Sequence, residues 1–275
     1  MSAERPVDAA VDRRIAFINP FGTAAFDAII EETLVPYAAR GTSVDVVHLE
    51  GVPVNIDYYY PMHLMQLAIF DEVRRLEERG YDAVVVGCCY DPGVRVAREL
   101  VDIPVVGPLE AAMNHASYFG HSFTVVTDHA KARPWLEDLV RLHGAANCRG
   151  VRAIDWYITD MIKDTTAVAD DAAARSLKAL DEDGSEVIIL GCTIIAGCLE
   201  REIMTTGRHR ELPILNPNLL ALKEAETLAD LHRAGKYAIS RAGQYQRHEQ
   251  HDAAEAADVW RRWKLVDIDH PEAGE

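Results

Sequence analysis

The chain has 275 residues, 49% of them hydrophobic and 26% charged, which is enough for one large or two small domains with a buried core. Its formal net charge of −16 argues against a nucleic-acid or anionic-membrane surface, because such surfaces are bound through basic patches. Residues 1–12 lack the pattern of a signal peptide, and no apolar run is long enough to span a bilayer. We therefore expect a cytoplasmic protein with neither a membrane nor a nucleic-acid partner.

In chain order, short β-rich runs alternate with helical patterns. The first half predicts a strand at 15–18, a helix at 26–39, a strand at 44–49, a helix at 62–79, a strand at 83–87, a helix at 94–101 and a strand at 104–107. The second half predicts a helix at 109–119, a strand at 122–127, a helix at 134–142, a strand at 151–154, a helix at 167–182, and strands at 186–191 and 213–215. This alternation is typical of an α/β fold with parallel sheets.

Two stretches of the chain repeat each other in the same order. Residues 81–89 (YDAVVVGCC) parallel residues 185–193 (SEVIILGCT), and residues 103–111 parallel residues 212–220. In both, an apolar strand ends in Gly-Cys, a short helix follows, and a second strand comes after Ile-Pro or Leu-Pro. The repeat predicts two similar Rossmann-like lobes with parallel sheets, related by a pseudo-twofold axis, with the active site in the cleft between them.

The two repeated cysteines, Cys88 and Cys192, stand where catalytic groups are expected. Each follows a glycine at the carboxyl end of a strand, where open α/β sheets bind ligands. Each also precedes a predicted helix, whose free N–H groups lower the pKa of a thiol and can hold an oxyanion. Two thiols that face each other across a cleft could remove a proton from a carbon next to a carbonyl and return one to the opposite face.

A free cysteine is often only a small core residue, and we keep that interpretation for Cys148 and Cys198. Cys89 is expected to point away from its neighbour or to line the edge of the pocket. The odd number of cysteines and the absence of a C-x-x-C pair favour free thiols and no zinc. No Gly-x-Gly-x-x-Gly fingerprint follows the first strand and no Schiff-base lysine stands out, so we expect neither a metal nor an organic cofactor.

Residues 14–231 resemble the aspartate/glutamate/hydantoin racemase superfamily, most closely its hydantoin and allantoin racemase branch. Four segments carry the resemblance: INPFGT (18–23), GVPVNIDYYY (51–60), GCCYDPGVRVARE (87–99) and LGCT (190–193). The third segment is the most specific, because it keeps the spacing of Cys, Asp, Pro and Gly in the family's motif. That spacing selects Cys88, not Cys89, as the family's first cysteine.

The resemblance implies a cofactor-independent racemase or epimerase of nitrogen or amino-acid metabolism, with Cys88 and Cys192 as acid and base. Its substrate would be a small hydantoin-, allantoin- or amino-acid-like molecule that bears a carboxylate or an imide. The resemblance also implies a homo-oligomer. Because such proteins return the chain to the first lobe, we expect lobe one at residues 13–108 plus 216–275 and lobe two at 109–215.

Eight further residues are candidates for substrate binding. Asn19 and Thr127 end the first strand of each lobe, although a turn cap is the alternative role for the asparagine. The others lie beside the cysteines or in the second family segment: Gly87, Cys89, Gly191, Thr193, Asp57 and Tyr58. Asp91 is instead expected to cap the helix that follows it.

Several positions depart from the family pattern. Phe21 and Gly22 replace an asparagine and a threonine, Thr193 and Ile194 replace a Gly-Ala pair, and three tyrosines occupy 58–60. The tail, residues 241–275, is longer than usual and predicts an extra helix with Trp260 and Trp263 on one side. These departures suggest that the machinery is kept while the substrate pocket differs.

Two other classes of function stay open. Relatives with one cysteine decarboxylate malonates or isomerise maleate, so a decarboxylase or cis–trans isomerase of small dicarboxylates is the first alternative. A non-catalytic protein that binds small ligands is the second. The presence of both cysteines favours racemisation over either of them.

Overall fold

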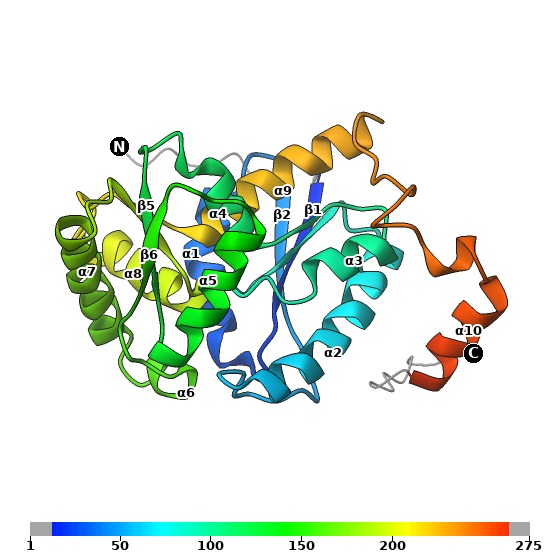
Figure 1. Ribbon diagram of the computed structural model, residues 1–275, viewed down its shortest axis with the longest axis horizontal. Helices are drawn as coiled ribbons and strands as arrows, with labels where there is room; N and C mark the ends of the chain where they lie inside the picture. Colours follow the sequence, from blue (N-terminus) through cyan, green and yellow to red (C-terminus); the bar gives the residue numbers. More distant parts are fainter. Residues whose placement is uncertain (1–12, 264–275) are drawn as a thin grey trace.

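Two parallel four-stranded sheets form the centre of the protein, which a computed structural model describes over residues 13–263. The first sheet holds β1 (Arg13–Asn19), β2 (Thr42–His48), β3 (Ala83–Val86) and β4 (Val105–Val106). The second sheet holds β5 (Phe123–Thr127), β6 (Cys148–Ala153), β7 (Val187–Leu190) and β8 (Ile214–Leu215). Both sheets run in the order second, first, third, fourth strand (Figure 1). The equal orders confirm the predicted α/β fold with two similar lobes.

The strands that carry the Gly-Cys pairs are fully buried. Every residue of β3 and β7 is buried, as expected for strands of a parallel sheet covered on both faces. Val86 pairs with Ile18 of β1, and Leu190 pairs with Val126 of β5. The chain therefore leaves both sheets at equivalent points, directly before Gly87 and Gly191.

Five helices lie within a few residues of their predicted ranges: α2 (Tyr59–Glu78), α3 (Val94–Leu100), α4 (Pro108–Ala116), α5 (Arg133–Leu142) and α7 (Thr165–Glu182). The single helix predicted at 26–39 is instead η1 (Ala24–Phe26), α1 (Asp27–Leu34) and η2 (Val35–Tyr37). Pro36 accounts for the last break, because proline cannot donate a helical hydrogen bond. The helix after Cys192, α8 (Thr193–Thr206), is longer than expected, and α6 (Ile158–Met161) was not predicted.

A further unpredicted helix, α9 (Pro217–Arg233), joins the end of the second sheet to the first. It packs against β1, β3 and β4, and Figure 1 shows it beside the first sheet. Helices α1 and α8 also pack together, so one hydrophobic core extends through both lobes. The position of α9 is consistent with a first lobe made of residues 13–108 plus 216–275 and a second lobe made of residues 109–215. These lobe boundaries stay a prediction.

The tail contains the extra helix that the sequence predicted, as η4 (His248–Gln250) and α10 (Ala253–Trp263). The guanidinium of Arg241 anchors it by donating to the carbonyl oxygens of Arg98 and Glu99 near the end of α3. The guanidinium of Arg74 stacks 3.9 Å from the centre of the Trp260 ring, which attaches α10 to α2. The predictions for residues 1–12, for the Trp263 side chain and for the tail beyond 263 lie outside what the structure describes.

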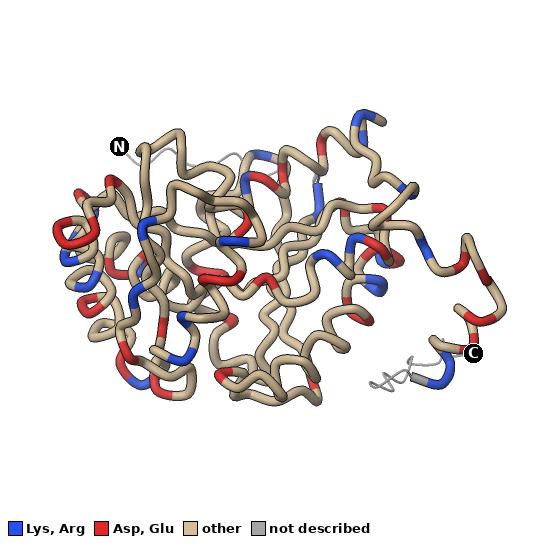
Figure 2. Tube along the Cα trace, in the orientation of Figure 1, with Lys and Arg blue, Asp and Glu red and all other residues tan. Residues whose placement is uncertain are grey.

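Acidic and basic residues are interspersed in both lobes (Figure 2). The excess of acidic residues is thus distributed over the molecule rather than gathered in one segment. Within residues 13–263, no helix is long and apolar enough to cross a membrane.

The two glycines at the strand ends should differ in how well they tolerate a side chain. A Cβ on Gly87 would lie 2.5 Å from the carbonyl oxygen of Ile18 and 2.1 Å from the Phe17 ring, whereas a Cβ on Gly191 would meet only side-chain carbons. We expect Gly87→Ala to lower the free energy of unfolding by about 1–3 kcal/mol and Gly191→Ala by less. Urea denaturation of both variants measures this difference, and equal losses would contradict it.

Candidate active site

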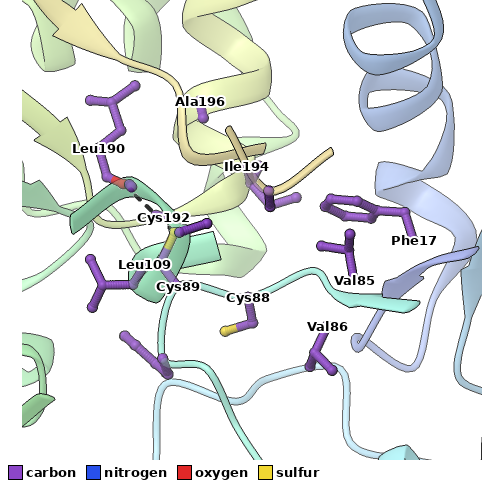
Figure 3. Close-up of a cluster of buried hydrophobic side chains, with 14 of the residues drawn as sticks. Phe17, Val85, Val86, Cys88, Cys89, Leu109, Leu190, Cys192, Ile194 and Ala196 are labelled. Atoms are coloured by element: carbon purple, nitrogen blue, oxygen red, sulfur yellow. Dashed lines mark hydrogen bonds between the residues drawn. The ribbon is translucent and has the colours of Figure 1, made fainter. Parts of the chain in front are cut away.

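The two repeated cysteines lie together in one buried cluster. Cys88 follows β3 and is 6% exposed, and Cys192 follows β7 and is 7% exposed. Figure 3 shows both cysteines and Cys89 among apolar side chains from the first and second sheets. The carboxyl ends of the two sheets thus meet at the thiols, where the sequence placed the cleft.

Hydrogen bonds between the lobes fix the loops that carry these cysteines. The hydroxyl of Thr193 donates to the carbonyl oxygen of Gly87 at 3.0 Å, and the amide of Asn218 donates to the carbonyl oxygen of Thr193. The thiol of Cys89 points at the carbonyl oxygen of Leu190, 3.6 Å away (Figure 3). The polar atoms of Cys89 and Thr193 are therefore engaged within the protein, and their expected part in substrate binding stays a prediction.

Burial is the main influence on both thiols, and it raises the pKa of Cys88 and of Cys192 well above the ordinary value. Backbone N–H groups oppose it, that of Tyr90 at Cys88 and that of Ile195 at Cys192. The carboxylate of Asp128 raises both pKa values further. The backbone N–H groups thus lower these pKa values as expected, but desolvation of the thiolate outweighs them, so the net change is upward and not the predicted lowering.

Asp128 and Tyr90 connect the lobes beside the thiols, and the sequence analysis missed both. The Asp128 carboxylate is buried and accepts hydrogen bonds from the Tyr90 hydroxyl at 3.2 Å and the Thr127 hydroxyl at 2.9 Å. Burial raises the pKa of Asp128. A signal for both was available, because Tyr90 closely follows Cys88 and Asp128 directly follows β5.

A second buried bridge joins Asp57 of the first lobe to His129 of the second. Their carboxylate oxygen and imidazole Nε2 are 3.2 Å apart, and the backbone N–H of Ala132 donates to Nδ1. Because Nδ1 accepts, the ring donates its Nε2 proton to Asp57. Burial lowers the pKa of His129, but the hydrogen bond to Asp57 and the nearby Asp128 raise it overall.

Asp57, Asp128 and His129 are also the residues that could hold a metal ion. Their ligand atoms lie within 4.8 Å of one another, the one such group found among residues 13–263. Carboxylate and imidazole ligands of this kind suit zinc or iron. However, both ring nitrogens of His129 already have hydrogen-bond partners in the protein. In the described structure the His129 ring is therefore fully hydrogen-bonded within the protein, and a metal ion would have to replace one of these bonds.

Asn19 and Thr127 are fully buried and hold the loops at the strand ends. The Asn19 amide donates to the Asp27 carboxylate at 2.6 Å and to the carbonyl oxygen of Thr23. The Thr127 hydroxyl also lies 3.1 Å from the carbonyl oxygen of Gly191. Contact of either residue with substrate stays a prediction, and their described bonds are structural.

Of two other expected residues, Asp91 takes a different role, and the part of Tyr58 in substrate binding stays a prediction. Asp91 does not cap α3, because its carboxylate accepts the backbone N–H groups of Leu109 and Glu110 and so caps α4. Burial raises the pKa of Asp91 to about 8. Tyr58 directly precedes α2 and is half exposed, with the Lys131 ammonium 5.7 Å from its ring centre.

Two hollows that the structure describes do not open onto the thiols. One of about 470 Å³ lies against α5 and β6, and its lining includes Glu137 and Arg149. Another of about 220 Å³ lies between the lobes and is bordered by Gln66, Tyr90 and Trp135. Neither is lined by Cys88 or Cys192, in keeping with the low exposure of both.

Replacing Asp128 by Asn should make both thiols react at lower pH. The substitution removes a charge that raises the pKa of Cys88 and Cys192, while the amide oxygen can still accept from Tyr90. Thiolate is the form that iodoacetamide attacks, so the pH profile of alkylation should move down. Peptide mass spectrometry measures this at each cysteine, with Asp183→Asn as the control. An unmoved profile would contradict the assigned effect of Asp128.

Comparison with known proteins agrees with the fold and identifies the family. The Asp/Glu/Hydantoin racemase family matches residues 15–225. A hydantoin racemase from Pseudomonas sp. (strain NS671) is 32% identical over 222 residues, which cover 79% of this chain and 86% of that protein.

Solved structures show the same architecture. Allantoin racemase from Klebsiella pneumoniae superposes with a TM-score of 0.77 at 27% identity, over 86% of this chain and 94% of that one. The maleate isomerase Iso from Pseudomonas putida S16 shares the fold alone, with a TM-score of 0.55 at 15% identity over 79% and 93% of the chains. The resemblance found in the sequence is thus confirmed, and the chain is an isomerase that belongs to the Asp/Glu/Hydantoin racemase family.

Proposed function

We propose that this protein is a cofactor-independent racemase or epimerase that uses Cys88 and Cys192 as acid and base on opposite faces of one carbon. The observation that carries the proposal is the equivalent, buried placement of the two thiols at the carboxyl ends of β3 and β7, near enough that charge on Cys88 raises the pKa of Cys192. Membership of a racemase family supports the same reaction.

The raised pKa values suit the two roles. A thiolate of high pKa is a strong base towards a carbon-bound proton, and its partner of high pKa stays protonated and ready to donate. The bond to the α-proton breaks as an S–H bond forms on one side, and the other thiol protonates the carbanion from the opposite face. Backbone N–H groups near the start of α8 are suited to meet the oxyanion of the enolate.

The charges near the thiols favour a neutral substrate. Asp57 and Asp128 both raise the pKa of Cys88, which means that the site also disfavours an added anion. A cyclic imide or ureide is uncharged, and its N–H groups can donate to carboxylates. We therefore infer that the substrate bears an imide rather than a free carboxylate. The relatives that are named hydantoin and allantoin racemases agree with this choice.

The alternative of a dicarboxylate decarboxylase or cis–trans isomerase fits this acidic site less well, although a maleate isomerase shares the fold. A purely ligand-binding role fits poorly with membership of an enzyme family. Exchange of the substrate's α-proton in deuterium oxide separates these functions, because a two-base racemase exchanges it and a binding protein does not. A cytoplasmic location and a homo-oligomer stay predictions.

Removal of either thiol should abolish racemisation. In Cys88→Ala and Cys192→Ala, one face of the carbon lacks its acid or base, so turnover of a hydantoin should fall by about 100-fold or more. Each variant can still exchange the α-proton of one enantiomer. Polarimetry and proton exchange measure the two effects, with Cys198→Ala as the matched control. Retained racemisation in either variant, or equal damage from Cys198→Ala in a folded protein, contradicts the assignment.

Racemisation should also survive extensive dialysis against a chelator, because thiols and backbone donors supply the chemistry that we propose. Turnover before and after dialysis, with added zinc as a reference, measures this. Loss on chelation and recovery with zinc would instead assign a metal to Asp57, Asp128 and His129.

A further inference from the structure

The segment between β2 and α2 lies where it can close the site. Ile56 and Asp57 are 3% and 5% exposed and belong to the buried part of the molecule. Asp57 bonds to His129, the residue after Asp128, and Asp128 bonds to Tyr90 beside the cysteines. A substrate must touch both sulfurs, and both are nearly inaccessible. Some part of the enclosure must therefore move.

The segment rests on a glycine that differs from the family pattern. A Cβ on Gly22 would lie 1.9 Å from the carbonyl oxygen of Val52 and 3.4 Å from the carbonyl carbon of Pro53. The threonine typical of the family would therefore push the segment away. Gly22 allows the backbone of residues 52–53 to lie directly on the loop that follows β1.

Contacts with the second lobe hold the other end of the segment. Inside, Asp57 accepts from His129 Nε2 at 3.2 Å and from the backbone N–H of Ile158 at 3.4 Å. Outside, the Lys131 ammonium lies 4.1 Å from the ring centre of Tyr59, which packs against Trp135. Tyr59 belongs to the run of three tyrosines that also departs from the family pattern.

From these contacts we propose that residues 52–59 form a cover over the two thiols, and that the Asp57–His129 hydrogen bond holds it closed. The need for the cover to open to substrate rests on the proposed function, whereas its closure over the thiols does not. Apart from Tyr59, the first residue of α2, the cover is irregular chain, so few backbone angles need to change when it opens. Gly22 and the tyrosine run thus both help to position the cover.

The test is the rate at which iodoacetamide alkylates Cys88 and Cys192 in His129→Asn. Asparagine can keep the N-cap bond to Ala132 but is too short to preserve the bond to Asp57. We expect alkylation at pH 8 to be about 10-fold faster than in the native protein, because the closed cover has lost its main hydrogen bond. Loss of a histidine near the thiols cannot lower their pKa, so electrostatics alone would leave the rate unchanged or slower.

Two controls make the result decisive. His48→Asn breaks another histidine–aspartate pair, 2.8 Å long and partly exposed, that lies within the first lobe, and should leave the rate unchanged. Cys198 is 2% exposed in α8 and reports global unfolding in every sample. An unchanged rate at Cys88 and Cys192 in His129→Asn, or a rise matched by Cys198, overturns the proposal.

The readout also separates this proposal from the function on which it partly rests. Alkylation needs no substrate and no turnover, so a protein that fails to racemise hydantoins can still show a cover. Conversely, if the protein racemises hydantoins but its thiols are alkylated no faster in His129→Asn, the proposed function stands and the cover proposal is overturned. Gly22→Thr gives a second, independent variant, because it displaces the segment without touching the Asp57–His129 pair. It too should speed alkylation of Cys88 and Cys192 but not of Cys198.

Discussion

Desolvation of two thiols is the physical constraint on which the site depends. Cys88 and Cys192 lie where the ends of two parallel sheets meet, and burial raises the pKa of both. A buried thiolate is costly, so it forms only where a nearby group or a substrate changes the balance. The same dry surroundings make each backbone N–H more effective towards an oxyanion. In the proposed mechanism, the high thiol pKa values and the stabilisation of the oxyanion thus have one cause.

The lobes are held around the thiols by polar bonds that start at strand ends. Thr193 donates to Gly87, Tyr90 to Asp128, and His129 to Asp57, each across the boundary between the sheets. All three hydrogen bonds are buried, and loss of one partner would leave a buried polar group unpaired, which lowers the free energy of unfolding. The first joins the two Gly-Cys turns directly, and the other two enclose them. Closure of the site and its geometry therefore depend on the same loops.

The sequence predicted the elements set by local pattern and missed those set by tertiary contact. Apolar runs such as residues 83–87 and 186–191 identify buried strands, and the Gly-Cys repeat identified two lobes. The helix N-terminus suggested a lowered thiol pKa, but only the folded chain shows that burial and Asp128 raise it. Asp91 had the pattern of a cap, yet which helix it caps depends on how α4 lies. The role of His129 could not be predicted from local sequence, because its partner Asp57 lies 72 residues away in the chain.

Duplication placed the two cysteines equivalently but did not make their surroundings equal. Cys192 immediately precedes a helix of 14 residues and meets the N–H groups of Ile194 and Ile195, whereas Cys88 meets that of Tyr90, and α3 begins only at Val94. In the proposed mechanism, two unequal bases give different barriers for the two directions of proton transfer. Free enantiomers have equal energies, so any difference in kcat between them must be balanced by KM. Asymmetry of the site therefore changes how tightly each enantiomer is held, and not the position of equilibrium.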